Sequence, residues 1–352
     1  MSLLFMKIFL FATAFFAGCS SSLFAQSIFP AAPELVSVKK IWHSDKHSAF
    51  TDLIHFGGKW LCVFRESAGH VGGNGVIRVL LSGDAENWEP VASLSEEGID
   101  LRDPKLSVTP DNRLMMVLGG SVYEGTKFIE RQSRVAFSAD GKTWTAPQRI
   151  LEKGDWLWRV TWHEGVAYGV TYAAAKPGAG QTNRPAGMTV KLVASDDGVA
   201  FRPVTQLEVP DSPNETTLRF LKNGDCVALV RREAGDKAAW IGRSSPPFKD
   251  WKWHGAGMQI GGPNFIVLDD GRMIASGRQY RNATWSESKI FVGRMDLQSV
   301  RAELILPSGG DCSYAGMVWR DGFLWLSYYS SHEGGSDIYF AKVRLPGTDR
   351  KE

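Results

Sequence analysis

The stretch Pro213–Glu233, PNETTLRFLKNGDCVALVRRE, predicts a β-hairpin with an acid and a base at one end. The run LRFLK is followed by Asn223-Gly224, a pair typical of tight turns, and then by a second apolar run, CVALV. A hairpin places the start of its first strand beside the end of its second strand. Glu215 and Arg231 should therefore lie at the same edge of one sheet, which favours an anionic ligand or a proton-transfer site.

Other hairpins of the same kind recur along the chain. Each has a short apolar strand, a turn rich in Gly or Asn, and a second apolar strand, and no long segment of helical periodicity separates them. The turns are FGGKW at 56–60, PDNRL at 110–114, HEGVA at 163–167, KNGDC at 222–226, DDGRM at 269–273 and RDGFL at 320–324. A unit that repeats about every fifty residues indicates a repeat architecture.

A second repeated element is the turn Ser138–Trp144, SADGKTW, in which Asp and Gly close a turn and the aromatic ring packs over it. Weaker copies are Ser82–Trp88, Ser195–Phe201 and Ser244–Trp251, and their aromatic ends lie 50 to 57 residues apart. Because turn chemistry explains every position, we assign this element to the outside of the fold and not to a substrate site.

Six units of four strands predict an all-β, six-bladed β-propeller. The expected blades are 44–90, 98–146, 156–203, 213–253, 261–300 and 311–346. Glu34–Trp42 should supply the strand that closes the ring with the sixth blade, which removes the open sheet edges. No linker is evident, so we expect one domain over residues 27–348.

The first 25 residues are typical of a signal peptide, with a single Lys7 before the apolar run IFLFATAFFAG. Phe16-Ala17-Gly18-Cys19 resembles a bacterial lipobox, which would attach lipid to Cys19 and tether the chain to a membrane. The alternative is cleavage near Ala25. Either way we expect an exported protein: periplasmic, an outer-membrane lipoprotein or secreted. No later apolar run is long enough to span a bilayer.

Composition excludes several classes of function. A formal net charge of +2 without a basic run argues against nucleic-acid binding, and 22% charged residues argue against disorder. Cys62 and Cys226 lie in apolar strands, which predicts buried free thiols. Without a C-x-x-C motif or a Cys/His cluster we expect no metal and no cofactor, and we expect a monomer.

Arginines recur at one position of the hairpins. Counted seven residues past the turn Gly or Asn, the second strands carry Arg65, Gly119, Tyr172, Arg231, Arg278 and Tyr329. Because blades converge on a central axis, the three arginines predict a shared anion site, with Tyr172 and Tyr329 beside it. The alternative is that each arginine is an exposed charge at a strand end.

The starts of the first strands carry a second polar set: Thr51, Asp52, Arg102, Asp103, Arg159, Glu215, Asn264 and Tyr314. Small residues flank Tyr314 in GGDCSYAGMVW, which should leave its phenol accessible. The alternative is a rim tyrosine that packs and hydrogen-bonds a carbonyl. Trp156 and Trp158 could equally stack on sugars or fill the core of the third blade.

The repeated turns, the six hairpins, PNE…ALVRRE and CSYAGMVWRDGFLWLSYYSS together resemble the sialidase superfamily over nearly all of the mature chain. The resemblance implies Tyr314 as nucleophile, Glu215 as its partner, and Arg231 and Arg278 as two arginines of a carboxylate-binding triad. The chemistry fits, because a neutral tyrosine is not repelled by the carboxylate on the anomeric carbon of a sialic acid.

Two departures from the family pattern affect the site. The segment Phe50–Leu53, FTDL, lacks the first arginine of the triad, and Arg65 could replace it from the other end of the same hairpin, while Arg102 is a further substrate-binding candidate. The loop Ser67–Asn74 lacks the aspartate that serves the family as acid/base. His70, Asp52 and Asp103 are the candidates for that role.

These residues support three functions. The first is an exported, sialidase-type glycoside hydrolase that removes a terminal anionic sugar. The second is a polysaccharide lyase or a hydrolase that acts on glycans containing uronic acids. The third is a glycan-binding propeller without catalysis.

Overall fold

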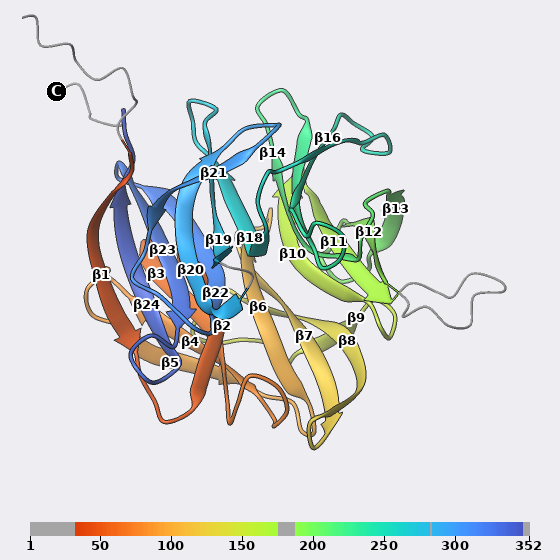
Figure 1. The fold of residues 1–352 in the computed structure, drawn as a ribbon. Coiled ribbons are helices and arrows are strands. Elements are labelled where there is room, and N and C mark those ends of the chain that lie inside the picture. The colour runs from red at the N-terminus through yellow and green to blue at the C-terminus, as the bar shows by residue number, and fades with distance from the viewer. Residues whose placement is uncertain (1–31, 175–186, 282–283, 348–352) are drawn as a thin grey trace, which may run out of the picture. The chain divides into compact units, whose positions relative to one another are not determined.

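Six four-stranded antiparallel sheets make up the part of the chain that the computed structural model describes, residues 32–174, 187–281 and 284–347 (Figure 1). Blade one is β2 (His47–Phe56), β3 (Lys59–Ser67), β4 (Val76–Ser82) and β5 (Glu89–Leu94). Blade two is β6 (Asp100–Val108), β7 (Leu114–Glu124), β8 (Lys127–Ser138) and β9 (Gln148–Ile150). Blade three is β10 (Trp156–His163), β11 (Val166–Ala174), β12 (Met188–Ser195) and β13 (Arg202–Leu207).

The remaining blades repeat this order. Blade four is β14 (Pro213–Phe220), β15 (Cys226–Arg232), β16 (Trp240–Ser244) and β17 (Lys252–Gly255). Blade five is β18 (Ile260–Val267), β19 (Met273–Arg281), β20 (Thr284–Met295) and β21 (Val300–Ile305). Blade six is β22 (Cys312–Arg320), β23 (Phe323–Ser330), β24 (Asp337–Arg344) and β1 (Glu34–Trp42).

The blades form a closed ring. The innermost strands β2, β6, β10, β14, β18 and β22 each contact the next, and β22 contacts β2. β1 pairs with β24, so the start and the end of the described chain share one sheet, as the sequence predicted. The six-bladed propeller is thus confirmed. Among the described residues no helix could cross a membrane, and Cys62 and Cys226 are buried free thiols.

Every innermost strand is interrupted by a bulge near its start. The pairing register shifts between Ala49 and Asp52 in β2, and between Ser313 and Gly316 in β22, with equivalent shifts in the other four. Bulges re-aim side chains and end regular pairing next to functional sites. Several bulge residues have positive φ, among them Asp103 at 51° and Tyr314 at 47°, a costly conformation for residues other than glycine.

The outer turns are held by their own side chains. Asp140 accepts hydrogen bonds from the backbone N–H groups of Lys142 and Thr143, at 2.8 Å each, and Trp144 Nε1 donates to the Gly141 carbonyl at 3.0 Å. In the fourth blade Trp251 Nε1 donates to the Phe248 carbonyl at 2.9 Å in the same way. These contacts account for the repeated Asp and Trp without any ligand.

Part of the second polar set links neighbouring blades and does not face a ligand. Thr51 Oγ1 donates to the Tyr314 carbonyl at 2.6 Å, and Asn264 Nδ2 donates to the Ala315 carbonyl at 2.8 Å. Asp52 is held by Arg159, whose Nη1 and Nη2 each lie 2.9 Å from one of its carboxylate oxygens. The prediction that Asp52 is a catalytic acid is therefore wrong, because both its oxygens are bound in a buried ion pair between blades.

Replacing Arg159 by methionine should lower the free energy of unfolding by about 3–5 kcal/mol, because Asp52 would remain buried without its cation. Denaturant unfolding measures this. Arg202→Met is a matched control. Arg202 also binds Asp196 through Nη1 and Nη2, but this pair is exposed to solvent. An equal loss in both variants would contradict a structural role for the buried pair.

Candidate active site

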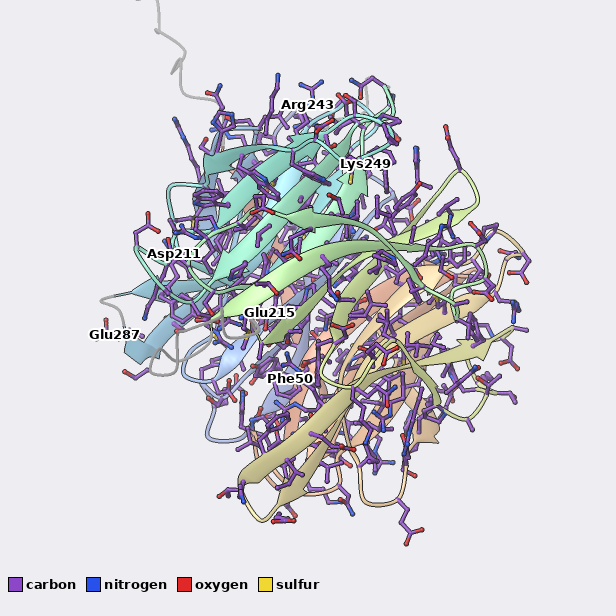
Figure 2. All side chains as sticks on the ribbon, turned by 90° about the vertical axis from the view of Figure 1, so that its right-hand side faces the viewer. Phe50, Asp211, Glu215, Arg243, Lys249 and Glu287 are labelled. Atoms are coloured by element: carbon purple, nitrogen blue, oxygen red, sulfur yellow. The ribbon has the colours of Figure 1, made fainter. Side chains whose placement is uncertain are left out.

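Tyr314 and Glu215, from blades six and four, meet near the middle of the ring. Tyr314 Oη donates to Glu215 Oε1 at 2.6 Å, and Arg231 Nη1 donates to Glu215 Oε2 at 2.8 Å. The backbone N–H of Gly262 adds a third donor to Glu215 at 2.9 Å. Figure 2 shows Glu215 and Phe50 toward the middle, with Arg243 and Lys249 at the outside. The hairpin thus brings Glu215 and Arg231 together as its sequence predicted.

The surroundings shift the pKa values of Glu215 and Tyr314 in opposite directions. Burial would raise the pKa of Glu215, but the charge of Arg231 and the hydrogen bonds from Tyr314 and Arg231 outweigh it, so this pKa lies below its usual value. Burial and the negative charges of Glu215 and Asp103 raise the pKa of Tyr314 well above its usual value. At neutral pH the pair is therefore a phenol hydrogen-bonded to a carboxylate.

Arg278 lies beside this pair. Its Nη2 donates to Tyr329 Oη at 3.2 Å, and its Nη1 donates to Tyr280 Oη at 3.3 Å. Arg231 Nη2 also donates to Tyr280 Oη, at 3.4 Å. Two guanidinium groups thus converge on one hydroxyl oxygen through long hydrogen bonds, a place that a ligand carboxylate could take.

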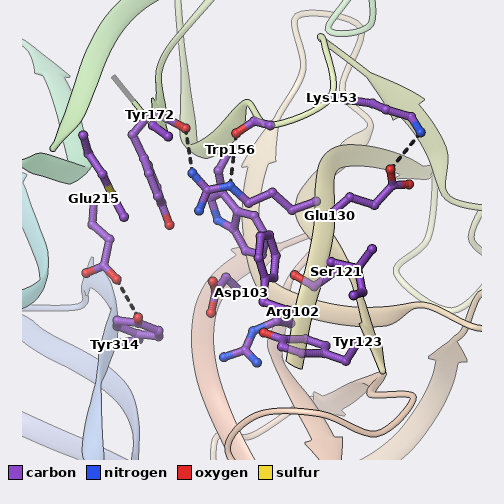
Figure 3. A pocket seen from close by; sticks show the side chains of 16 residues that line it. Arg102, Asp103, Ser121, Tyr123, Glu130, Lys153, Trp156, Tyr172, Glu215 and Tyr314 are labelled. Carbon is purple, nitrogen blue, oxygen red and sulfur yellow. Dashed lines mark hydrogen bonds and ion pairs between the residues drawn. The ribbon is translucent and has the colours of Figure 1, made fainter. Parts of the chain in front are cut away.

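A cavity of about 650 Å³ opens beside Tyr314 and Glu215, within the size range of small-molecule sites. Blades two and three supply its other wall, with Arg102, Asp103, Tyr123, Trp156 and Tyr172 (Figure 3). Arg131 also lines it. The guanidinium of Arg131 lies 4.7 Å from the Tyr172 ring centroid. Trp156, Trp158 and Tyr172 all belong to the buried core, and of these three only Trp156 and Tyr172, which was predicted to bind substrate, also line the cavity.

Asp103 faces Tyr314 across this cavity (Figure 3). It is 7% exposed, and its Oδ1 is buried without a hydrogen-bond partner among the described residues. Burial, reinforced by the charge of Glu215, raises its pKa despite the nearby cations Arg102 and Lys105. A carboxyl group in such a setting tends to stay protonated, as a general acid requires.

Arg65 and Arg278 have the same register but different surroundings. Each pairs with the residue just before the bulge of its blade, Ala49 and Gly261. Arg65 binds both oxygens of Asp100, at 2.7 and 3.0 Å, and is fully buried. The expectation that Arg65 completes the anion clamp is therefore wrong, because its guanidinium is occupied by Asp100 and loop carbonyls.

Arg102 is the better replacement for the missing arginine. It lines the cavity, and its guanidinium carbon lies 4.8 Å from the centroid of the Phe50 ring. Its Nη1 donates to the carbonyl of His70 at 3.0 Å and to Asp100 Oδ2 at 3.2 Å. Arg102 thus supplies a cation to the cavity wall from blade two, whereas Arg231 and Arg278 come from blades four and five.

His70 lies outside the lining of this cavity. Its Nδ1 is 2.6 Å from Asp311 Oδ2, and Tyr329 Oη donates to the other oxygen, Oδ1, at 3.0 Å. Tyr329 therefore connects Arg278 to Asp311 and lines no wall of the cavity. The structure separates the two remaining acid candidates, with Asp103 in the cavity and His70 beside Asp311.

Sequence reasoning missed Lys105. Its Nζ is 4.9 Å from the Tyr314 ring centroid and 4.8 Å from that of Trp158, so this buried cation lies against the face of the tyrosine. Burial lowers its pKa to about 8, against the raising effect of Asp52 and Asp103. The sequence of its strand, DLRDPKLSV, is rich in charged residues and gave no clear signal that this lysine would be buried.

Comparisons with known proteins support the fold. No family model matches the chain, and no curated protein does. A Dyadobacter fermentans protein of unknown function superposes with a TM-score of 0.74 at 21% identity, covering 89% of this chain and 99% of that one. Trypanosoma rangeli sialidase, in complex with the inhibitor DANA, gives 0.65 at 12% identity over 88% of this chain.

The endosialidase of phage phi92 is also similar, with a TM-score of 0.65 at 9% identity, covering 89% of this chain and 70% of that one. This chain spans only 58% of the length of the Trypanosoma rangeli enzyme. The chain therefore has a sialidase-like propeller fold. The predicted signal peptide and the lipid site at Cys19 lie outside the described residues.

Proposed function

We propose that this protein is a glycoside hydrolase of sialidase type that removes a terminal carboxylated sugar, such as a sialic acid, from glycans. The observation that carries the proposal is the 2.6 Å hydrogen bond from Tyr314 to Glu215 beside Arg231 and Arg278. A phenol activated by a carboxylate suits a sugar whose own carboxylate would repel an acidic nucleophile.

Binding comes first in this mechanism. The sugar carboxylate takes the place of the Tyr280 hydroxyl between Arg231 and Arg278, so that its two oxygens accept charge-assisted hydrogen bonds. Arg102, which lines the cavity, supplies the third cation. Tyr172 and Trp156 provide flat faces against which the sugar ring packs.

Bond exchange follows. Tyr314 Oη attacks the anomeric carbon while its proton passes to Glu215, and Asp103 gives a proton to the departing glycosidic oxygen. Because the pKa of Tyr314 is raised and that of Glu215 lowered, this proton transfer is uphill alone and must accompany formation of the carbon–oxygen bond. Water, deprotonated by Asp103, then releases the sugar, and Glu215 returns the proton to Tyr314.

A release assay on anionic glycosides tests the proposal. The enzyme should liberate the sugar from a sialoside, or from another glycoside that carries a carboxylate at its anomeric carbon, and should not cleave a neutral glucoside. An ultraviolet-absorbing unsaturated product from a uronate polymer would instead establish a lyase. Binding of these glycans without any product would leave a non-catalytic propeller and end the proposal.

A further inference from the structure

A second cluster of polar side chains lies next to the catalytic groups and takes no part in the mechanism above. His47 Nε2 and His70 Nδ1 lie 2.8 and 2.6 Å from the same oxygen of Asp311, Oδ2. The three ligand atoms all lie within 4.8 Å of one another. We propose that His47, His70 and Asp311 bind a divalent transition-metal ion such as Zn²⁺.

The donor set suits such an ion. Two imidazole nitrogens and one carboxylate oxygen are ligands that zinc and its neighbours accept at about 2.0–2.2 Å, whereas Ca²⁺ and Mg²⁺ prefer oxygen alone. Ligands at that distance stand about 3 Å apart, so each imidazole nitrogen already has the required distance to Asp311 Oδ2. Drawing the two nitrogens together requires shifts of about an ångström, within the reach of side-chain rotation.

Asp311 is oriented by groups behind it. Tyr329 Oη donates to Oδ1 at 3.0 Å, so that Oδ2 is the oxygen turned toward the histidines. Such hydrogen bonds behind a ligand fix its orientation at metal sites. The side chains of His70 and Asp311 are 40% and 24% exposed, which leaves a path from solvent.

The loop that carries His70 is fastened in place by two arginines. Arg65 donates to the carbonyls of Gly69 and Gly72, at 2.8 and 3.1 Å, and Arg102 donates to the carbonyl of His70 at 3.0 Å. A glycine-rich loop would otherwise be free to hold His70 in many positions. These hydrogen bonds place the imidazole of His70 against Asp311. They also explain why Arg65 is buried, since its guanidinium holds this loop.

A bound ion would join blade one to blade six, because the histidines belong to β2 and to the loop after β3, while Asp311 precedes β22. These blades meet where the ring closes. An ion that binds only the folded ring raises its stability by RT ln(1 + L/Kd), where L is the free-ion concentration. The site should therefore be detectable by thermal unfolding as well as by direct binding, and neither measurement depends on the proposed hydrolase activity.

Titration of metal-stripped protein with ZnCl₂ in a calorimeter tests the proposal. We expect one equivalent to bind and to raise Tm, with no binding of Ca²⁺ or Mg²⁺ at the same concentrations. His47→Ala and His70→Ala should each weaken binding by about a hundredfold or more, since the loss of even an outer-shell partner costs about 10- to 100-fold. Both variants should remain folded, as circular dichroism would verify.

His43→Ala is the matched control, because His43 Nδ1 also contacts a carboxylate oxygen, Asp337 Oδ1 at 2.9 Å, without a second histidine. This variant should bind Zn²⁺ as the unmodified protein does. Absence of Zn²⁺ binding at about a hundredfold molar excess, or binding that survives in both His47→Ala and His70→Ala, would overturn the proposal. The cluster would then be only a hydrogen-bonded His–Asp–His arrangement.

Discussion

Turnover of the Tyr314→Phe variant is expected to fall by about a thousandfold or more, because the variant lacks the oxygen that would form the covalent intermediate. The substitution keeps the ring, whose neighbours Phe50, Trp158 and Tyr329 hold it at centroid distances of 5.4, 5.0 and 6.1 Å. Glu215 loses one donor but retains Arg231 and the N–H of Gly262. The chain should therefore fold and still bind substrate.

The measurement is kcat with the substrate that the release assay identifies, alongside binding of that substrate to the variant. Tyr328→Phe is the matched control: Tyr328 is the neighbour of Tyr329 in the same strand, and its hydroxyl donates to the Pro307 carbonyl at 2.8 Å. It should lose little activity. Unchanged turnover in Tyr314→Phe would rule out the tyrosine mechanism, whatever the substrate.

The second large effect concerns Asp103. Asp103→Asn should lower kcat by about a hundredfold or more on a glycan substrate, whose leaving alcohol needs a proton, because general-acid catalysis supplies about 10²–10⁴-fold. On an aryl glycoside with an acidic phenol as leaving group the loss in bond cleavage should be much smaller. Comparing the two substrates separates proton donation from a general defect in binding or folding.

The same variant should be more stable than the unmodified protein at neutral pH. The folded-state pKa of Asp103 is raised, so between its unfolded and folded values the native state binds more protons than the unfolded state, and stability falls as the pH rises through that window. The asparagine side chain does not ionise, so the variant does not lose stability in this way. The gain in Tm should therefore shrink as the pH falls through that window and should be absent below about 4, the ordinary pKa of an aspartate.

The pH dependence of activity follows from the same shift. Catalysis needs Asp103 protonated and Glu215 ionised, and the pKa of Glu215 is lowered, so activity should be lost on the alkaline side as Asp103 ionises. Asp103→Asn should remove this alkaline limb. An alkaline limb that persists in the variant would assign the proton donor to another group, and His70 would be the next residue to test.

The hydrophobic and turn pattern was sufficient for the fold. Six strand–turn–strand units and the spare strand Glu34–Trp42 are local features, and a ring is the arrangement in which every such sheet is covered on both sides. The proximity of Glu215 and Arg231 could also be predicted from the sequence, because both belong to one hairpin whose turn determines which residues are neighbours.

Contacts between blades could not be predicted from the sequence in the same way. Arg65 and Arg278 were indistinguishable in sequence because they occupy the same register of their hairpins. Their difference lies in the next blade: Arg65 binds both oxygens of the Asp100 carboxylate at 2.7 and 3.0 Å, whereas Arg278 Nε donates to the carbonyl of Cys312 at 2.6 Å and its Nη2 lies 3.9 Å from Asp311 Oδ1. A residue's role here depends on a neighbour that no local pattern specifies.

The amino-acid sequence by itself determined the six sheets, their order and the strand that closes the ring, since hydrophobic alternation and turn residues act over a few neighbouring positions. Only the tertiary structure decided which polar groups face the cavity. It placed Asp52 in an ion pair with Arg159, left Asp103 Oδ1 without a hydrogen-bond partner within the described part of the chain, and brought His47, His70 and Asp311 together. The burial and the charge around each of these groups come from several blades at once. The blades approach one another only after the ring has closed, so these effects on each side chain arise only in the folded structure.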